Sequence, residues 1–165
     1  MSGPLHPAKT QKPNGHGKQA LRVWLQLLTL TTLIEKRIRK NLLAEFATTL
    51  PRFDVLASLD RASGKLTMGE LSRRLLVSKG NVTGIVSELE RQGLVRRERD
   101  AYDRRTHYLE LTPKGLKHFR ELAAAHRAWV AKLFARAGDR RLQRLLKDLS
   151  RVKTAVSDER EEKAA

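Results

Sequence analysis

Apolar residues recur every three or four positions along most of this chain, a spacing that places them on one face of an α-helix. The longest run covers residues 19–48, and the charged stretch EKRIRK within it supplies a polar face. Its apolar positions are Leu21, Trp24, Leu28, Leu33, Ile34, Ile38, Leu42 and Phe46. The pattern predicts one long amphipathic helix.

Shorter helices follow, each marked by residues that favour the start of a helix. Pro51 lies at a first-turn position and opens a helix over 51–62. Thr67 stands three residues before Glu70, a pairing that forms a capping box and starts a helix over 67–76. These signals predict two short helices in succession.

The next segment, SKGNVTGIVSELERQG at 78–93, has an unusual composition for a helix. Gly80 and Gly84 each cost about 1 kcal/mol of helix stability relative to alanine. With Ser78 as the N-terminal cap, the buried stripe consists of Val82, Ile85, Val86 and Leu89. The outward positions are Lys79, Gly80, Asn81, Thr83, Gly84 and Ser87. Something other than helix stability therefore explains the outward residues.

Two strands are predicted after this helix. Gly93 is a C-terminal helix cap, and LVRRERD and THYLEL flank the AYDRR stretch at 101–105. Leu109 and Leu111 alternate toward one face, as in a strand with one buried side. Residues 51–111 are thus predicted to form three short helices followed by a two-stranded ribbon. This is the element order of a winged helix-turn-helix, whose third helix enters the DNA major groove.

Long helices flank this region on both sides. Thr112 and Pro113 cap and begin one of them, and leucines at helical spacing predict another over 139–157. The fold class is therefore mainly α with a small two- to three-stranded β-wing, between dimerisation helices at 19–48 and 113–157. These helices carry more apolar surface than a small winged domain can cover, and a two-fold dimer would bury it.

The charge of the chain narrows the class of partner. The 165 residues carry a formal net charge of +16, which favours nucleic acid first and an anionic membrane surface second. The length fits one domain over 19–157, between a disordered basic tail at 1–18 and a C-terminal tail at 158–165. Without cysteine, disulfides, cysteine-ligated zinc and thiol chemistry are excluded. Arg22 and Gln26 interrupt the most apolar window and no signal peptide precedes it, so we expect a cytoplasmic protein without a membrane span.

The outward side of the 78–93 helix has the chemistry of a DNA-reading surface. Its small residues let the backbone approach base edges, while Asn81, Thr83 and Ser87 supply hydrogen-bonding groups. Lys79 is unfavourable beside the positive end of the helix dipole unless a phosphate binds there, which the lysine and the free N–H groups would both stabilise. The alternative is that the small residues merely permit tight packing of helix on helix.

Basic residues also occupy the ribbon. Asp103 can pair with Arg104 or Arg105 and hold the turn, which leaves the other arginine to enter a minor groove. The alternative is a charged tip that is only solvated. Further arginines positioned for phosphate contacts are Arg73, Arg74, Arg96, Arg97 and Arg99.

The stretch SRRLLVSKGNVTGIVSELERQGLVRRERDAYDRRTHYLELTPKG resembles the MarR-type transcriptional regulators. The resemblance covers residues 19–157 and rests on the DRR of the wing, the LTPKG that returns to a helix, and the recognition helix directly before GLVRR. It implies a homodimer with interlocked terminal helices, and a repressor that leaves a palindromic double-stranded DNA operator when a small ligand binds. The predicted DNA-binding residues are Arg73, Arg74, Ser78, Lys79, Gly80, Asn81, Thr83, Ser87, Arg97, Arg99, Asp103, Arg104 and Arg105.

The resemblance also implies an effector. Within the family, LPRFDVLASLDRA with SKGNVTG looks closest to regulators of aromatic-acid catabolism, so the implied effector is an aromatic acid or its CoA thioester. It would bind between the dimer helices and the winged domain. The candidate ligand-binding residues are Trp24, Leu28, Arg37, Phe46, Phe53 and Leu56. The alternative is that the apolar five belong to the core and that Arg37 lies on a solvated face.

Enzyme signatures are missing from the sequence. The five histidines lack metal-ligand spacing, and there is no nucleophile elbow or phosphate loop, so no cofactor is expected. GHGKQA at 15–20 matches a dinucleotide-loop pattern, but no strand precedes it. The sequence therefore predicts a sequence-specific transcriptional regulator. The alternatives are a nonspecific basic architectural DNA-binding protein, and a protein-interaction or membrane-surface module with the same winged fold.

Overall fold

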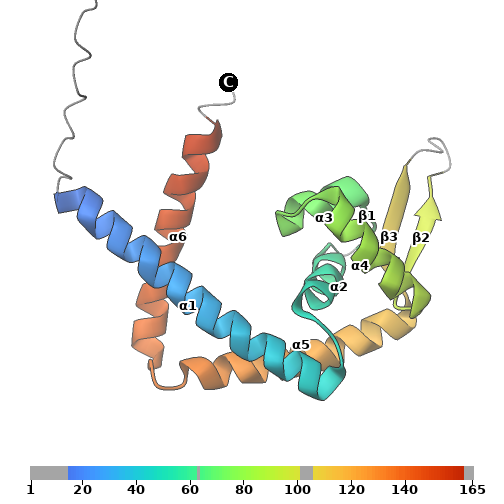
Figure 1. Ribbon diagram of the computed structural model, residues 1–165, viewed down its shortest axis with the longest axis horizontal. Coiled ribbons are helices and arrows are strands. Elements are labelled where there is room, and N and C mark those ends of the chain that lie inside the picture. The colour runs from blue at the N-terminus through green and yellow to red at the C-terminus, as the bar shows by residue number, and fades with distance from the viewer. Residues whose placement is uncertain (1–14, 63, 101–105, 162–165) are drawn as a thin grey trace, which may run out of the picture.

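The computed structural model describes residues 15–62, 64–100 and 106–161. Over these residues the protein is mostly helical, with a small three-stranded antiparallel sheet, as the sequence predicts (Figure 1). In chain order the elements are α1 (Gly15–Phe46), α2 (Leu50–Arg61), β1 (Leu66–Thr67), α3 (Met68–Leu75), α4 (Lys79–Arg91), β2 (Val95–Arg99), β3 (His107–Leu111), α5 (Pro113–Phe134) and α6 (Asp139–Glu161).

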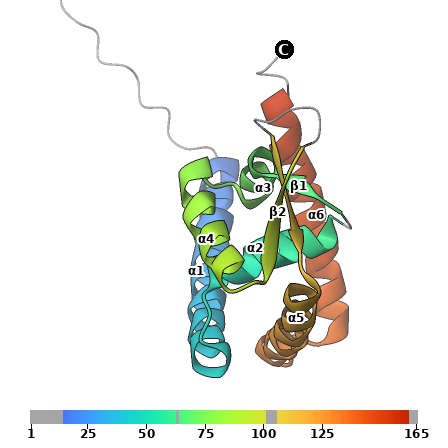
Figure 2. The same ribbon diagram turned by 90° about the vertical axis from the view of Figure 1, so that its right-hand side faces the viewer.

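The molecule consists of a compact lobe and long helical arms. The lobe contains α2, α3, α4 and the sheet, while α5 leads away from it and α6 turns back from the far end of α5 (Figure 1). The ribbons of α1 and α6 cross in that view, but Figure 2 shows them on opposite sides of the molecule. The two arms therefore do not pack along each other within one chain.

The core of the lobe lies where α2, α4 and the sheet meet. Leu56, Val82, Val86, Leu89 and Leu109 are each no more than 1% exposed. Burying a side chain of this size contributes about 1.5–3 kcal/mol relative to leaving it exposed. The long helices close this core from outside, through Ile38, Leu42, Phe119 and Leu122.

The sheet has the strand order β1-β3-β2, and both pairs are antiparallel. Leu109 on the central strand is paired with Leu66 of β1 on one side and with Arg97 of β2 on the other. β1 has only two residues, which is too short for an alternating pattern to reveal it in the sequence.

Side-chain caps fix the starts of α3, α4 and α5, as the sequence predicts. The backbone N–H of Glu70 donates to Thr67 Oγ1 at 3.2 Å, and the Thr67 N–H donates to Glu70 Oε2 at 2.8 Å, which completes the capping box. The Thr67 hydroxyl donates to the same Glu70 oxygen at 2.8 Å, and the two bonds that Thr67 donates to this carboxylate, from its N–H first, hold the pKa of Glu70 below its ordinary value. Thr112 caps α5 in the same way by accepting a bond from the Gly115 N–H at 2.9 Å.

The outer ends of the arms differ from the sequence expectation. α1 begins at Gly15 and α6 continues to Glu161, so residues 15–18 and 158–161 are helical rather than parts of the expected tails. No proline lies between Gly15 and the body of α1, or between Asp139 and Glu161, so neither segment contains a residue that removes a backbone donor from the helix.

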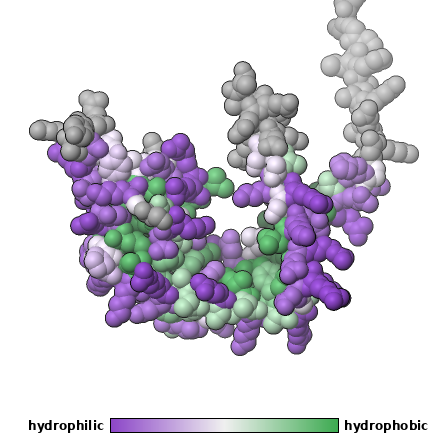
Figure 3. All heavy atoms as spheres, turned by 180° about the vertical axis from the view of Figure 1, so that it is seen from behind, coloured by the Kyte–Doolittle hydropathy of each residue, from purple (hydrophilic) through white to green (hydrophobic). Residues whose placement is uncertain are grey.

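Many large apolar side chains on the arms are exposed. Figure 3 shows apolar surface in the hollow between the lobe and α6. On α1 and α6 the exposed set consists of Leu21, Val23, Trp24, Leu25, Leu28, Leu30, Leu33, Leu43, Leu145, Leu146, Leu149, Val152 and Val156. Within the described part of the chain, no helix is both long and apolar enough to cross a membrane.

Candidate nucleic-acid interface

The α4 helix has one buried face and one exposed face. Val82, Val86 and Leu89 anchor it in the core, and Ile85 is half-buried, so the predicted stripe is confirmed. The opposite face presents exposed Gly80, Asn81, Thr83, Gly84 and Ser87. A polar face with small side chains is thereby held outward on a rigid element.

The two glycines of α4 are not needed for packing within the chain. A Cβ added at Gly80 or Gly84 would meet no atom within 4 Å. This finding excludes, for the single chain, the alternative that these glycines permit tight helix packing. Because glycine weakens a helix interior by about 1 kcal/mol, its presence on an open face suits a close approach by something outside the chain.

Gly115, in contrast, is a glycine that close packing within the chain requires. A Cβ at this position would lie 1.8 Å from the carbonyl oxygen of Leu94, an impossible distance. The start of α5 therefore packs directly on the backbone that leads into β2. The sequence highlighted Gly115 only as part of the LTPKG pattern, because a contact between distant segments leaves no local signal.

The start of α4 is capped as predicted. The Ser78 hydroxyl accepts a bond from the Asn81 N–H at 3.4 Å, and the first turn contains no acidic residue. Lys79 opens the helix. The remaining N–H groups of this turn point out of the helix end, where an anion such as a DNA phosphate is favoured.

Arginines of the wing lie beside α4. Arg97 on β2 donates to Glu90 of α4 at 2.9 Å, and its side chain is only 31% exposed. This ion pair joins the ribbon to the helix. Arg97 is thus partly engaged within the protein. Arg99 lies at the outer end of β2 and is exposed.

Further ion pairs fix the ribbon. Arg96 donates to Glu110 across the β2–β3 pair at 2.7 Å, and Lys65 pairs with Glu98. The Lys65 ammonium holds the pKa of Glu98 below its ordinary value. Exposed pairs of this kind add little to stability but orient the strands. Sequence reasoning missed Lys65, which directly precedes β1, because its partner Glu98 lies 33 positions away on β2 and such a separation leaves no local signal.

The turn between α3 and α4 places two more predicted residues at the surface. Arg73 and Arg74 lie in the last turn of α3, and both are exposed. The chain then turns at Leu76, whose φ of 55° is left-handed and whose side chain is 84% exposed. The predicted Asp103, Arg104 and Arg105 lie outside the described residues.

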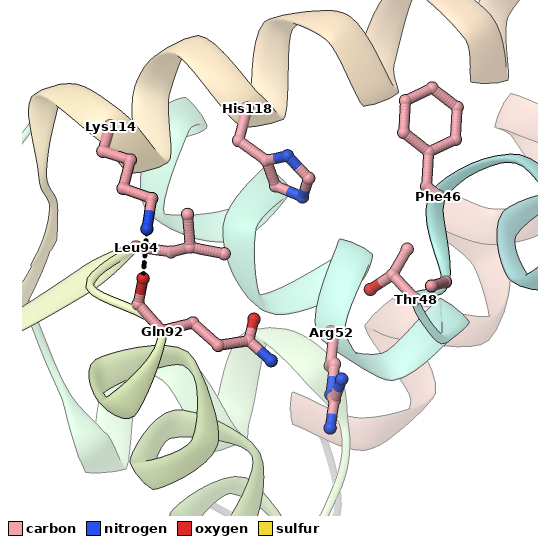
Figure 4. Close-up of a pocket in the computed structure, with 8 residues that line it drawn as sticks. Phe46, Thr48, Arg52, Gln92, Leu94, Lys114 and His118 are labelled. Carbon is pink, nitrogen blue, oxygen red and sulfur yellow. Dashed lines mark hydrogen bonds between the residues drawn. The ribbon is translucent and has the colours of Figure 1, made fainter.

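The predicted ligand-binding residues are divided between surface and core. Trp24 and Leu28 are about half exposed on α1, and Arg37 is also exposed on α1. Phe53 and Leu56 are buried in the core, and Phe46 borders a cavity of about 310 Å³ between the α1–α2 turn and the start of α5 (Figure 4). Within one chain these six residues do not gather at one place, and their role as a ligand site stays a prediction.

A different cavity borders α4 directly. It measures about 470 Å³ and lies between α1, α2, the α3–α4 turn and the start of α4. Its lining consists of Arg39, Pro51, Asp54, Leu75, Val77, Asn81 and Ile85. Burial, with Glu35 nearby as a second cause, raises the pKa of Asp54. Arg39 donates to Glu35 at 2.8 Å, so the charged groups here are already coupled.

Comparison with known proteins agrees with this geometry. Residues 48–106 match the model of the MarR family. The HTH-type transcriptional regulator YcgE of Bacillus subtilis is 33% identical over 105 residues, which cover 64% of this chain and 65% of the relative. The transcriptional activatory protein BadR of Rhodopseudomonas palustris is 32% identical over 107 residues, covering 64% and 60%. This chain therefore spans less than two thirds of the length of these curated relatives.

Solved structures match over a larger share of the chain. AbsC, a MarR family transcriptional regulator from Streptomyces coelicolor, has a TM-score of 0.73 at 26% identity, covering 90% of this chain and 99% of AbsC. A MarR family transcriptional regulator from Silicibacter pomeroyi has a TM-score of 0.74 at 29% identity, covering 87% and 99%. All four named relatives are transcriptional regulators, which agrees with the expectation that the chain is not an enzyme.

Proposed function

We propose that this chain is a homodimeric repressor of the MarR family of transcriptional regulators. The match to the family model and the structural neighbours support this proposal. The repressor binds a palindromic operator through α4 and the wing, and a small aromatic acid or its CoA thioester releases it. The observation that carries the DNA-binding part is the outward face of α4, where Gly80 and Gly84 are open to solvent and flank Asn81 and Thr83.

The charges around α4 support DNA as the partner. Arg73, Arg74 and Arg99 are exposed on the elements beside it, and the sequence adds the predicted Arg104 and Arg105 between β2 and β3. Phosphate contacts from these groups position the protein, while polar groups on α4 read base edges. The net charge of +16 strengthens both specific and nonspecific binding.

A second copy of the chain is the proposed partner for the arms. The exposed apolar side chains of α1 and α6 form surfaces too large for a monomer to leave in water (Figure 3). Leu145, Leu146 and Leu149 of α6, together with residues of α5, line an apolar groove of about 440 Å³. A two-fold dimer would cover them and present two α4 helices to successive major grooves, which predicts a palindromic site.

The cavity beside α4 is the proposed effector site. An aromatic ring suits its apolar wall, and a carboxylate could pair with Arg39 in place of Glu35. Asn81 borders the same cavity and also lies on the exposed face of α4. A ligand that displaces Asn81 would therefore favour a state with lower affinity for DNA.

The test of operator recognition is fluorescence anisotropy on two duplexes at near-physiological salt. One carries the palindrome upstream of the gene for this chain, and the other a scrambled version. A preference of about a thousandfold supports the regulator. Equal affinity for both, with a steep dependence on salt, favours the nonspecific architectural alternative.

The test of release adds benzoate or 4-hydroxycinnamoyl-CoA to the operator complex. We expect the anisotropy to fall as the parent protein leaves the operator. The Arg39→Gln variant should bind the operator as tightly as the parent protein but should not be released by the ligand. A reporter gene behind the operator decides the direction of regulation. Repression predicts higher expression in the absence of the protein, whereas lower expression would assign activation instead.

A further inference from the structure

The α6 helix carries two stripes on opposite faces. Its apolar stripe consists of Leu142, Leu145, Leu146, Leu149, Val152 and Val156. Its basic stripe consists of Arg140, Arg144, Lys147 and Arg151, which follow one another at spacings of four, three and four positions. Since each residue turns an α-helix by about 100°, these four lie within one narrow arc, and the apolar stripe is centred on the other side of the helix.

The basic stripe is exposed and unpaired. All four of its side chains are exposed. Figure 3 shows hydrophilic surface along the outer side of α6 and apolar surface toward the hollow between the lobe and α6. Among the residues that the structure describes, none of the four forms an ion pair, and the nearby Asp139 and Asp148 pair with none of them. Their charges are therefore not balanced within the described part of the chain.

A row of like charges is not what a solvated helix face requires. Cations three or four positions apart repel one another along a helix, so the basic stripe weakens α6. A face that only keeps a protein soluble can alternate its charges, as the EKRIRK stretch of α1 does, where Arg39 donates to Glu35 at 2.8 Å. The basic stripe instead keeps one sign over about 16 Å, at 1.5 Å per residue, which suits a polyanion.

The chemistry of this face favours DNA over a protein or a membrane. Interfaces between proteins are centred on buried apolar and aromatic side chains, and the basic stripe contains none. A helix that lies on a membrane inserts its apolar stripe, which on α6 is the face that the proposed dimer covers. DNA phosphates need only cations at intervals, and the arginine guanidinium can bind a phosphate through two parallel hydrogen bonds. The phosphate backbone of DNA therefore fits this face best.

We propose that the basic stripe of α6 binds the phosphate backbone of a DNA segment other than the one that α4 reads. Figures 1 and 2 both show α6 on the far side of the molecule from α4, so one straight duplex does not follow both helices of the same chain. The inference rests on the proposed dimer, which covers the apolar stripe and leaves the basic stripe outward. The protein would thus hold two DNA segments at once.

The experiment is two-colour fluorescence cross-correlation on the full chain at low salt. A duplex with the palindrome upstream of the gene for this chain carries one dye, and a scrambled duplex carries the other. We expect the two dyes to diffuse together, because one protein holds both duplexes. The co-diffusion should fall steeply as salt is added, since each phosphate contact releases counterions.

Paired variants separate the basic stripe from the rest of α6. Arg144→Gln with Lys147→Gln removes two charges of the stripe. The matched control is Arg141→Gln with Lys153→Gln, which removes an arginine and a lysine that are exposed on α6 outside the stripe. When the scrambled duplex is titrated onto the palindrome complex, the slope of log affinity against log salt should fall by about 1.8 in the stripe variant, about 0.9 for each lost contact. The control should keep the parent slope, and sedimentation checks that both variants assemble as the parent does.

Three results overturn the proposal. In the first, the scrambled duplex only displaces the palindrome from the parent protein. In the second, the stripe variant keeps the parent co-diffusion, or the control variant loses as much as the stripe variant. In the third, labelled polyglutamate binds the palindrome complex through the stripe and the scrambled duplex does not, so that the surface fits an acidic protein. Equal affinity for palindrome and scrambled duplex contradicts operator recognition alone, because co-diffusion requires only that two duplexes are held.

Discussion

At the scale of single residues, the glycines of α4 and α5 have opposite roles. Gly84→Ala should stabilise the protein by about 0.5–1 kcal/mol, because a helix interior prefers alanine and the added Cβ meets nothing. The same methyl group should weaken operator binding, since it projects from the exposed face of α4 that is proposed to contact DNA. Thermal unfolding and fluorescence anisotropy measure the two effects.

Gly115→Ala provides the contrast to Gly84→Ala. The added Cβ would collide with the backbone of Leu94, so we expect a loss of about 1–3 kcal/mol of stability, as for other overpacked sites. If Gly84→Ala leaves operator affinity unchanged, DNA does not approach α4 closely at that position.

His126 gives the protein a residue-scale dependence on pH. Its ring lies 4.6 Å from that of Phe53, and burial lowers the pKa of His126 below the ordinary value of 6.5. The unfolded chain therefore takes up this proton more readily than the folded protein, so the contribution of His126 to stability is present above pH 6.5 and falls as the pH drops through this value. Melting temperatures measured between pH 5 and pH 8 should show the decline.

The control for this decline is His126→Phe, which keeps an aromatic ring against Phe53 and cannot be protonated. We expect a flatter profile for this variant than for the parent protein. His16→Asn, which changes an exposed residue of α1, should leave the profile unchanged. A parent-like slope in His126→Phe would show that another group causes the pH dependence.

At the scale of elements, α4 and the ribbon form one connected surface, which is the proposed DNA-reading surface. The Arg97–Glu90 pair joins them, and the buried stripe of α4 fixes which residues face outward. Asn81→Ala should reduce discrimination between operator and random DNA by about 1–3 kcal/mol, because an amide that reads a base edge is lost. Parallel titrations on the two duplexes measure this difference, and an equal loss on both would remove Asn81 from base reading.

At the scale of the whole molecule, the single chain leaves the apolar faces of its arms uncovered. Leu146 is 67% exposed and Leu149 is 38% exposed on α6. In the proposed dimer, Leu146→Glu with Leu149→Glu should cost about 3 kcal/mol or more of association energy, since two leucines are no longer buried. Sedimentation analysis should show monomers, and operator affinity should fall with dimerisation.

Arg151→Glu is the control for the dimer test. It introduces an acidic residue on α6 away from the leucine stripe, and Arg151 is exposed. This variant should remain a dimer. If the leucine substitutions also leave the protein dimeric, the interface does not include this part of α6.

The sequence by itself determined the elements and the two faces of α4. Helical spacing, the Thr67–Glu70 capping box, the Ser78 cap and the turn at Gly93 are local signals, and a local signal acts between residues a few positions apart. For the same reason, the outward positions of Asn81, Thr83 and Ser87 follow from the buried stripe alone. The helical ends of the arms were less predictable, because neither packing nor a strong stop signal marks them.

Only the tertiary structure decided which residues from distant segments meet. It shows that Gly115 packs on Leu94, whereas a Cβ at Gly84 would meet no atom within 4 Å, and that Arg97 forms an ion pair with Glu90. It also separates the six predicted ligand residues and brings Arg39, Asp54 and Asn81 to one cavity. Spacing along the chain does not encode such distances, because they depend on how the lobe and the long helices pack against one another.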